Sequence, residues 1–246
     1  MGNNTLDNIL IEEIYKKYQS RYNISLPKIQ NIKRVNNSEA WARFVSDDLY
    51  NKKYILYIDK DLLNKNKKFI KQILYHEFTH LADSLNFLNK TADEFKNIMS
   101  SYSEFHASKR EMVERLEEID DSSNISLHTE IIHAGILTIE SFMGQSFELM
   151  KKDLVQMSSN TFENFYYNTN HIYYFYGFVK ALQCFNIDYP INIFSLPSTF
   201  LLQIEEIQKI LLSDNIIMDK LIVNHLKLED TIKNQCIINK ILNNTL

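Results

Sequence analysis

The sequence predicts an α+β fold, with a small N-terminal β-sheet and an amphipathic helix followed by an all-helical C-terminal half. Two kinds of observation support this prediction. The 246 residues include only four glycines and three prolines, which is too few for a turn-rich all-β protein. β-Like runs occur before residue 60, and apolar residues recur with helical spacing beyond residue 67. We expect one domain over residues 1–120 and a helical domain or extension over residues 127–246.

The first part of the chain is expected to contain one helix and three strands. Residues 6–18 have mostly helical apolar spacing, which predicts the helix. Three short β-like runs cover residues 28–35, 40–45 and 53–58, and the last run alternates and is enriched in aromatic and β-branched residues. The polar stretch 46–52 separates the last two runs, so we expect them to pair as a hairpin or meander.

Helical patterns dominate from residue 67 onward. The run 67–86 has a stripe of apolar residues on one face, formed by Ile70, Leu74, Phe78, Leu81 and Leu85. The loop-like stretch 120–126 is the best candidate for a domain boundary. Beyond it, helical patterns cover residues 127–152, 161–185, 199–213 and 216–243.

Two capping-box patterns follow the run 67–86. Thr91 is followed three positions later by Glu94, and Ser101 is followed three positions later by Glu104. Each pattern is typical of the first turn of a helix. We therefore expect two helices here, a short one near residues 92–99 and a longer one near residues 102–119.

His76, Glu77 and His80 form an H-E-x-x-H pattern within the run 67–86. Histidines at positions i and i+4 project from one face of a helix, so both imidazoles can reach a single metal ion. Glu77 points about 100° further around the helix, where it can accept a proton from a metal-bound water. We therefore predict a Zn²⁺ site with Glu77 as the catalytic base. The alternative is that all three are solvated polar residues of an amphipathic helix.

Residues from about 28 to 115 resemble a zincin-type metallopeptidase domain, in which strands precede a helix that carries the H-E-x-x-H signature. The resemblance implies that residues 1–120 form such a domain. It also implies that the last strand before this helix, here 53–58, is a sheet edge to which a substrate peptide adds as an extra strand. The layout is similar to intracellular zincin-like peptidases encoded in phages and integrative elements of low-GC bacteria, including those that cleave repressors.

A catalytic zinc site needs a third protein ligand. In the gluzincin branch of the family a following helix supplies a glutamate, which here implies Glu104, 24 residues after His80. The alternative for Glu104 is a capping role with Ser101, in which its carboxylate accepts a hydrogen bond from a backbone N–H. Glu94 and Glu111 are the reserve candidates for the third ligand.

Two further roles have open alternatives. Asp83 lies on the histidine face of the helix but too far along it to share one metal, so we expect it either to orient His80 or to be an exposed acid at the helix end. An extra hydrogen-bond donor to the reacting carbonyl is expected from a histidine or a tyrosine. The candidates are Tyr102, His106, His133, His171 and Tyr174.

The composition of the sequence limits the binding partners and the cellular location that we expect. The net charge of −4 does not favour a nucleic-acid partner, and no apolar stretch approaches the roughly 18 residues of a membrane span. Two cysteines and an N-terminus without a signal-peptide pattern predict a cytoplasmic location. The expected function is a zinc-dependent endopeptidase with a cytosolic protein or peptide substrate. The alternatives are a non-catalytic zincin-fold regulatory or interaction module and a different zinc hydrolase.

Overall fold

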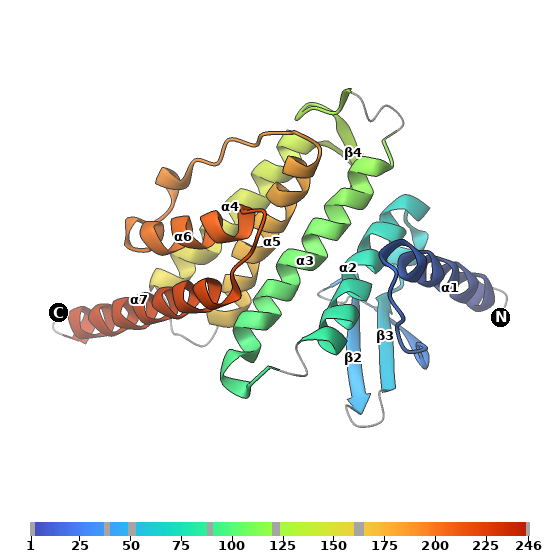
Figure 1. Ribbon diagram of the computed structural model, residues 1–246, viewed down its shortest axis with the longest axis horizontal. Helices are drawn as coiled ribbons and strands as arrows, with labels where there is room; N and C mark the ends of the chain where they lie inside the picture. Colours follow the sequence, from blue (N-terminus) through green and yellow to red (C-terminus); the bar gives the residue numbers. More distant parts are fainter. Residues whose placement is uncertain are drawn as a thin grey trace.

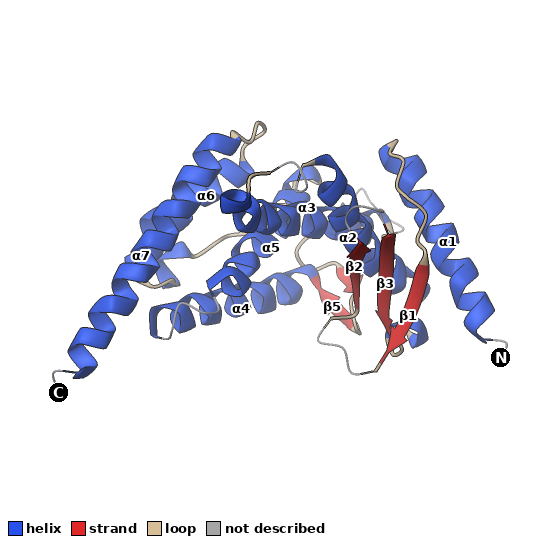
Figure 2. Cartoon of the chain, turned by 90° about the horizontal axis from the view of Figure 1, so that it is seen from below, coloured by secondary structure: helices blue, strands red, loops and turns tan. Residues whose placement is uncertain are grey.

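The computed structural model describes residues 3–36, 40–48, 53–87, 91–119, 124–159 and 165–244. It shows a mixed α+β protein that is mostly helical and has a three-stranded sheet in its N-terminal part (Figure 1 and Figure 2). The long helix α3 (Lys96–Glu117) runs through the middle of the molecule. The sheet lies on one side of α3, and the C-terminal helices lie on the other side.

The N-terminal helix α1 (Asn3–Tyr22) forms where its apolar spacing predicts a helix, and it is longer than predicted at both ends. Its side chains Ile11, Ile14 and Tyr18 are buried in a hydrophobic cluster shared with helix α2 and the sheet. The apolar face of α1 therefore covers one side of the N-terminal core.

The sheet consists of β1 (Asn31–Val35), β2 (Ala42–Asp48) and β3 (Lys53–Asp59), in the order β1-β3-β2. Strand β3 pairs in parallel with β1 and antiparallel with β2, which confirms the predicted pairing of the last two strands. The predicted turn 46–52 begins too early, because β2 continues to Asp48. Residues 49–52 lie outside the described residues.

The expectation that residues 53–58 form a sheet edge is wrong, because β3 is the central strand. Side chains on both of its faces are buried, namely those of Tyr54, Ile55, Leu56 and Ile58. A strand that is covered on both faces has a nearly continuous apolar sequence, and β3 has this character. The edge beside helix α2 is instead β2, whose single neighbour among the described strands is β3.

Helix α2 (Lys67–Asn86) confirms the predicted helix over residues 67–86. The side chain of Asn66 caps its start by accepting a hydrogen bond from the backbone N–H of Lys68. The apolar stripe is buried against α1 and the sheet, through Ile70, Leu74, Phe78 and Leu81. This packing fixes the rotation of α2 and turns its histidine face away from the sheet core.

Two separate helices after α2 were expected, and the structure has one. A single helix α3 follows a short 3₁₀ turn at Asp93–Phe95. Ser101 lies within α3, and its hydroxyl donates a hydrogen bond to Asn170 rather than capping a helix. The hydroxyl of Thr91 bonds back to the carbonyl oxygen of Phe87. The alternative capping role for Glu104 is therefore wrong, because Glu104 lies inside a continuous helix.

The predicted helix over residues 127–152 is wrong for residues before Ile139, where the structure has two strands. The prediction of an all-helical C-terminal half is therefore also wrong. Strands β4 (Glu130–Ile132) and β5 (Ile136–Thr138) form a two-stranded antiparallel hairpin. The backbone N–H of His133 donates to the carbonyl oxygen of Gly135 at 2.8 Å and closes the turn. Isoleucines on both sides of a glycine favour paired strands over a helix at this position.

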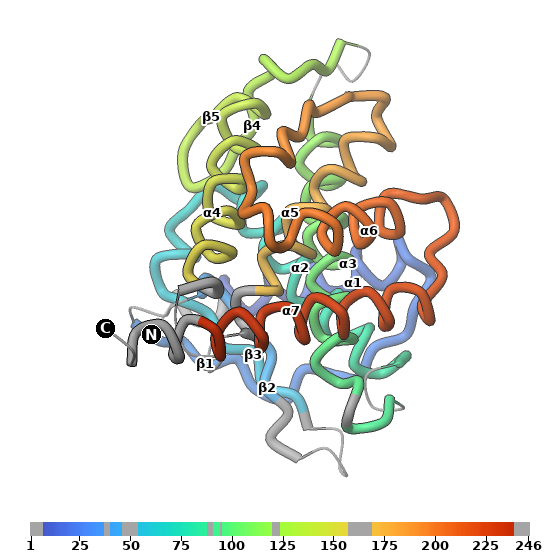
Figure 3. The backbone as a smooth tube through the Cα atoms, turned by 90° about the vertical axis from the view of Figure 1, so that its left-hand side faces the viewer, coloured from blue at the N-terminus to red at the C-terminus, as the bar shows by residue number. Residues whose placement is uncertain are grey.

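Four α-helices follow the hairpin in the described part of the chain. They are α4 (Ile139–Ser159), α5 (Phe165–Cys184), α6 (Leu201–Leu212) and α7 (Met218–Asn244). Helix α5 packs along α3, and α6 and α7 lie next to each other (Figure 3). No helix within the described ranges has both the length and the apolar character that crossing a membrane requires.

A second hydrophobic cluster joins α3 to the C-terminal helices. Its buried members include Phe105, Met112, Phe142, Tyr173 and Phe178. Helix α3 therefore contacts α2 on one side and α5 on the other, and it can bring side chains from both parts of the chain together. The predicted domain boundary at 120–126 stays a prediction, and its residues 120–123 lie outside the described part of the chain.

Candidate metal centre

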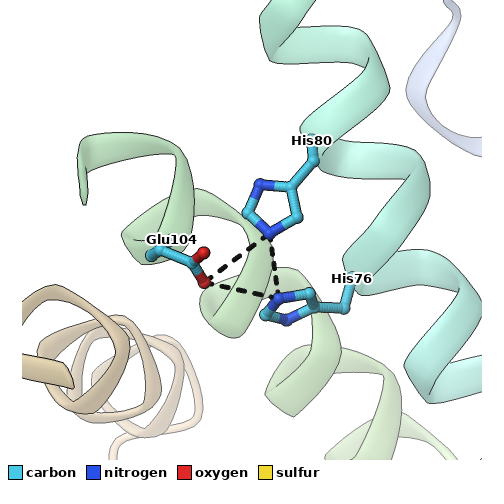
Figure 4. Close-up of side chains that lie close together, drawn as sticks. All are labelled: His76, His80 and Glu104. Carbon is cyan, nitrogen blue, oxygen red and sulfur yellow. Dashed lines mark hydrogen bonds and ion pairs between the residues drawn. The ribbon is translucent and has the colours of Figure 1, made fainter. Parts of the chain in front are cut away.

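His76 and His80 lie one helical turn apart on the face of α2 that points toward α3 (Figure 4). Their Nε2 atoms are 3.0 Å apart, and their ring centroids are 4.7 Å apart. Glu104 on α3 points its carboxylate into the same space, with Oε2 3.5 Å from His76 Nε2 and 3.6 Å from His80 Nε2. Three atoms that are typical metal ligands therefore converge from two helices.

The other ring nitrogen of each histidine has a hydrogen-bond partner on α3. His76 Nδ1 is 3.0 Å from Oε2 of Glu111, and His80 Nδ1 is 2.8 Å from the hydroxyl of Ser103. The Ser103 hydroxyl donates its own hydrogen to Asp83 at 2.9 Å, so it accepts one from His80. In the neutral form of each imidazole the proton is then on Nδ1, and the lone pair of Nε2 faces Glu104.

Asp83 and Glu111 thus act beside the converging atoms rather than among them. Asp83 is buried, so the alternative of an exposed acid at the helix end is wrong. It reaches His80 through Ser103 and not by direct contact. Glu111, a reserve candidate for the third ligand, instead accepts from the far nitrogen of His76. The side chain of Glu94, the other reserve, lies outside the described part of the structure.

The charges at this site favour a bound cation. Burial disfavours a charged imidazole at His76, yet the carboxylates of Glu104 and Glu111 overcome this and raise its pKa to about 10. Burial also opposes ionisation of Glu104, but His80 and His76 hold the pKa of this carboxyl well below its usual range. The pocket therefore stabilises positive charge between the carboxylates and the imidazoles, and this is what a divalent metal supplies.

The spacing of the three atoms fits zinc. Zinc bonds to histidine nitrogen and carboxylate oxygen are about 2.0–2.2 Å long, so two ligands of a tetrahedral site lie roughly 3.4 Å apart. The observed separations are 3.0, 3.5 and 3.6 Å. The side chains of His80 and Glu104 are 23% and 25% exposed, so part of the group reaches solvent. Among the described residues, no fourth histidine, cysteine or carboxylate atom joins the three, so they do not form a closed structural zinc site with four protein ligands.

Glu77 lies beside this group and is held by the edge strand β2. Its Oε2 accepts a hydrogen bond from the backbone N–H of Phe44 at 3.2 Å. Burial, together with the negative charge of Glu104, raises the pKa of Glu77, although both histidines oppose the shift. The carboxylate is therefore fixed in position by the main chain, and its environment makes it a better proton acceptor than an exposed glutamate.

Tyr174 is the candidate donor that lies nearest to the histidines. Its ring centroid on α5 is 5.8 Å from that of His76. Burial, followed by the charges of Glu111 and Glu104, raises the pKa of its hydroxyl well above the usual value, so the hydroxyl keeps its proton. The remaining candidates contact other groups, and they are Tyr102, His106, His133 and His171.

A close crossing of α3 and α5 brings Tyr174 to this place. Gly177 lies at the crossing, where a Cβ atom would overlap the hydroxyl of Ser108 and the carbonyl oxygen of Phe105. Tyr174 is one turn before Gly177 on α5 and packs on Phe178 with ring centroids 4.4 Å apart. The absence of a side chain at Gly177 therefore lets α5 approach α3 closely enough for Tyr174 to contact His76.

Sequence reasoning did not assign a role to Ser103 or Arg115, and it kept Glu111 only as a reserve ligand. The signal for Glu111 was its position two helical turns after Glu104, which puts both on one face of α3. Arg115 follows Glu111 by four positions, a spacing at which opposite charges pair on a helix. Ser103 carried no such signal, because its partner Asp83 is on another helix.

Comparison of the chain with protein-family models, with curated proteins and with solved structures finds no match.

Proposed function

We propose that this chain is a zinc-dependent metallopeptidase of the zincin type, with zinc held by His76, His80 and Glu104. The observation that carries the proposal is the convergence of two imidazole Nε2 atoms and one carboxylate oxygen within 3.6 Å of one another, with His80 and Glu104 partly exposed. Two histidines, one glutamate and an open position are the donor set of a catalytic zinc site. The adjacent carboxylate of Glu77 distinguishes this group from a purely structural site.

Bound zinc, Glu77 and Tyr174 would each have a separate role in peptide hydrolysis. Zinc bound here would act as a Lewis acid and lower the pKa of a coordinated water to about 7. Glu77 accepts a proton at its carboxylate and then returns it to the amine that leaves. Tyr174 donates a hydrogen bond from its hydroxyl to the substrate oxygen on which negative charge develops.

Strand β2 favours a peptide over other amide substrates. The N–H and C=O groups of one residue in an antiparallel strand point to the same side. Because the N–H of Phe44 bonds to Glu77, the polar backbone groups of Phe44 point away from β3. An extended peptide could pair with the outward-facing groups of β2 other than the Phe44 N–H, which already donates to Glu77, and this would bring its backbone beside Glu77 and the zinc ligands.

The test is the Glu77→Gln variant, which keeps the shape of the side chain and removes its basicity. The zinc-loaded wild type is expected to cleave a quenched-fluorescent peptide library, and Glu77→Gln to lower the rate by about 10²- to 10⁴-fold with zinc still bound. The exposed carboxylate variant Glu117→Gln on α3 is the control. Equal activity of Glu77→Gln and wild type rejects the catalytic assignment. Zinc binding without cleavage by the wild type favours the non-catalytic module.

A further inference from the structure

Arg115 is a fully buried cation that lies behind the candidate metal centre. Its guanidinium forms an ion pair with Oε1 of Glu111, one turn before it on α3. On the other side, the Nη1 group is 3.2 Å from the carbonyl oxygen of Ile132 and 3.0 Å from Nδ1 of His133, both in the β4–β5 hairpin. The side chain of Arg115 is 0% exposed, so its interactions are with protein groups rather than with bulk water.

Glu111 is the link between Arg115 and the metal ligand His76. One carboxylate oxygen of Glu111 contacts Arg115, and the other lies 3.0 Å from Nδ1 of His76. The contacts form a continuous path from the hairpin through Arg115 and Glu111 to an imidazole whose Nε2 faces Glu104. A carboxylate in this position fixes the tautomer and the ring orientation of a histidine ligand.

The rings around Arg115 hold its guanidinium in one place. Phe142 on α4 lies 4.9 Å from the guanidinium carbon, measured to the ring centroid, and Phe69 on α2 lies at 5.9 Å. A planar guanidinium can bond to a carboxylate with one nitrogen and to a backbone carbonyl with another, whereas a lysine ammonium is a single point donor. The geometry therefore requires the fork of an arginine at this position.

We propose that Arg115 is a positioning residue for the metal centre, which anchors Glu111 to the β4–β5 hairpin and thereby keeps His76 Nε2 turned toward the metal. The inference rests on the zinc site of the proposed function. In this arrangement the β4–β5 hairpin helps to orient His76, a ligand on α2, through Arg115 and Glu111. Loss of Arg115 then changes the affinity for zinc without removing any ligand atom.

The experiment measures the zinc dissociation constant by competition with a fluorescent chelator, and the visible spectrum of the Co²⁺-substituted protein. Arg115→Met is expected to weaken zinc binding by about 10- to 100-fold, the range seen when a partner of a metal-bound histidine is lost, and to alter the Co²⁺ spectrum. Arg115→Lys restores part of the affinity. Glu111→Gln weakens zinc binding to a similar extent, because a neutral amide replaces the carboxylate.

A double variant tests whether Arg115 acts through Glu111. If it does, Arg115→Met adds little to the loss already caused by Glu111→Gln, whereas independent effects would multiply. The double variant also removes the carboxylate that Arg115→Met alone leaves buried without its partner, so it serves if the single variant does not fold. The control is Glu114→Gln. Glu114 also lies on α3, and this substitution breaks its ion pairs with Arg21 of α1 and Lys71 of α2.

The outcomes separate this inference from the proposed function. Wild-type zinc affinity in a folded Arg115→Met, or a double variant whose losses multiply, overturns the positioning role and leaves the zinc site intact. A loss as large in Glu114→Gln as in Arg115→Met also overturns it, because the effect would then follow stability alone. A wild-type protein that binds no zinc overturns the positioning role together with the proposed function.

Discussion

The Nε2 atoms of His76 and His80 face each other at 3.0 Å, and in the neutral rings the hydrogen bonds at Nδ1 leave a lone pair on each Nε2. Two lone pairs at this distance repel each other unless a positive charge lies between or beside them. Glu104 adds a carboxylate oxygen 3.5–3.6 Å away and increases the demand for a cation. The three residues could therefore hold a metal ion, which would supply this charge.

Glu104→Gln is expected to weaken zinc binding by more than about 100-fold, because the loss of a direct ligand exceeds the 10- to 100-fold effect of losing a partner of a ligand. The amide keeps the size of the side chain but not its negative charge. Competition with a chromogenic chelator measures the dissociation constant. Glu117→Gln, which changes another glutamate of α3, should bind zinc as the wild type does. Unchanged affinity in Glu104→Gln would mean that Glu104 is not a ligand.

Tyr174→Phe is expected to lower kcat by about 10²- to 10³-fold and to leave zinc affinity unchanged, because the hydroxyl would stabilise charge on the substrate and would not bind the metal. The matched control is Tyr176→Phe on the same helix, whose hydroxyl bonds to Gln208 instead. Steady-state kinetics on a cleaved peptide separates kcat from KM. A change in KM alone would show that Tyr174 contributes to binding and not to the chemical step.

Gly177→Ala is expected to destabilise the protein by about 1–3 kcal/mol, because the added methyl group would force α3 and α5 apart. Gly144→Ala on α4 is the control. A Cβ at Gly144 would meet no atom within 4 Å, so the helix propensity of alanine should stabilise this variant by up to about 1 kcal/mol. Urea unfolding measures both changes. If the two substitutions have the same effect, the α3–α5 crossing is not as tight as the structure shows.

His225 is expected to make the free energy of unfolding depend on pH in the acidic range. It is fully buried on α7 with its Nδ1 2.9 Å from the hydroxyl of Tyr173, and burial lowers its pKa from 6.5 to about 4. The unfolded chain binds the proton more readily, so stability is complete above pH 6.5 and falls as the pH drops toward 4. The full loss from this group is about 3 kcal/mol.

The measurement is urea unfolding at several pH values between 4 and 7. His225→Gln should flatten the decrease in stability over this window, because glutamine does not titrate. His128→Gln is the control, since the side chain of His128 is 83% exposed. A slope that His225→Gln leaves unchanged would assign the acid sensitivity to other groups, among them His133, whose pKa burial and Arg115 lower to about 4.

The strands show where local patterns stop being informative. The three β-like runs correctly predicted three strands, because the residue types and alternation that favour a strand are local features of the sequence. Which strand is central depends on pairing, and the parallel pairing of β1 with β3 places β3 between β1 and β2. The edge strand beside α2 was therefore assigned to the wrong segment, although the continuous apolar character of β3 was visible in the sequence.

The capping-box patterns also failed to predict where a helix starts. Ser101 and Glu104 have the spacing of a helix start, but the hydroxyl of Ser101 bonds to Asn170, which is 69 positions away. The hairpin β4–β5 was missed for a related reason. Each of its strands has three residues, which is too short for the spacing of apolar residues to distinguish a strand from a helix. In both cases long-range contacts decide between local alternatives.

The sequence by itself determined the pair His76 and His80 and the neighbouring Glu77, because the spacing of residues along one helix fixes which side chains share a face. The tertiary structure decided the rest of the candidate site. Glu104, Ser103, Glu111 and Tyr174 reach the histidines only because α3 packs against α2 and α5 packs against α3. Contacts between helices depend on how whole apolar faces fit together, and no short stretch of sequence contains that information.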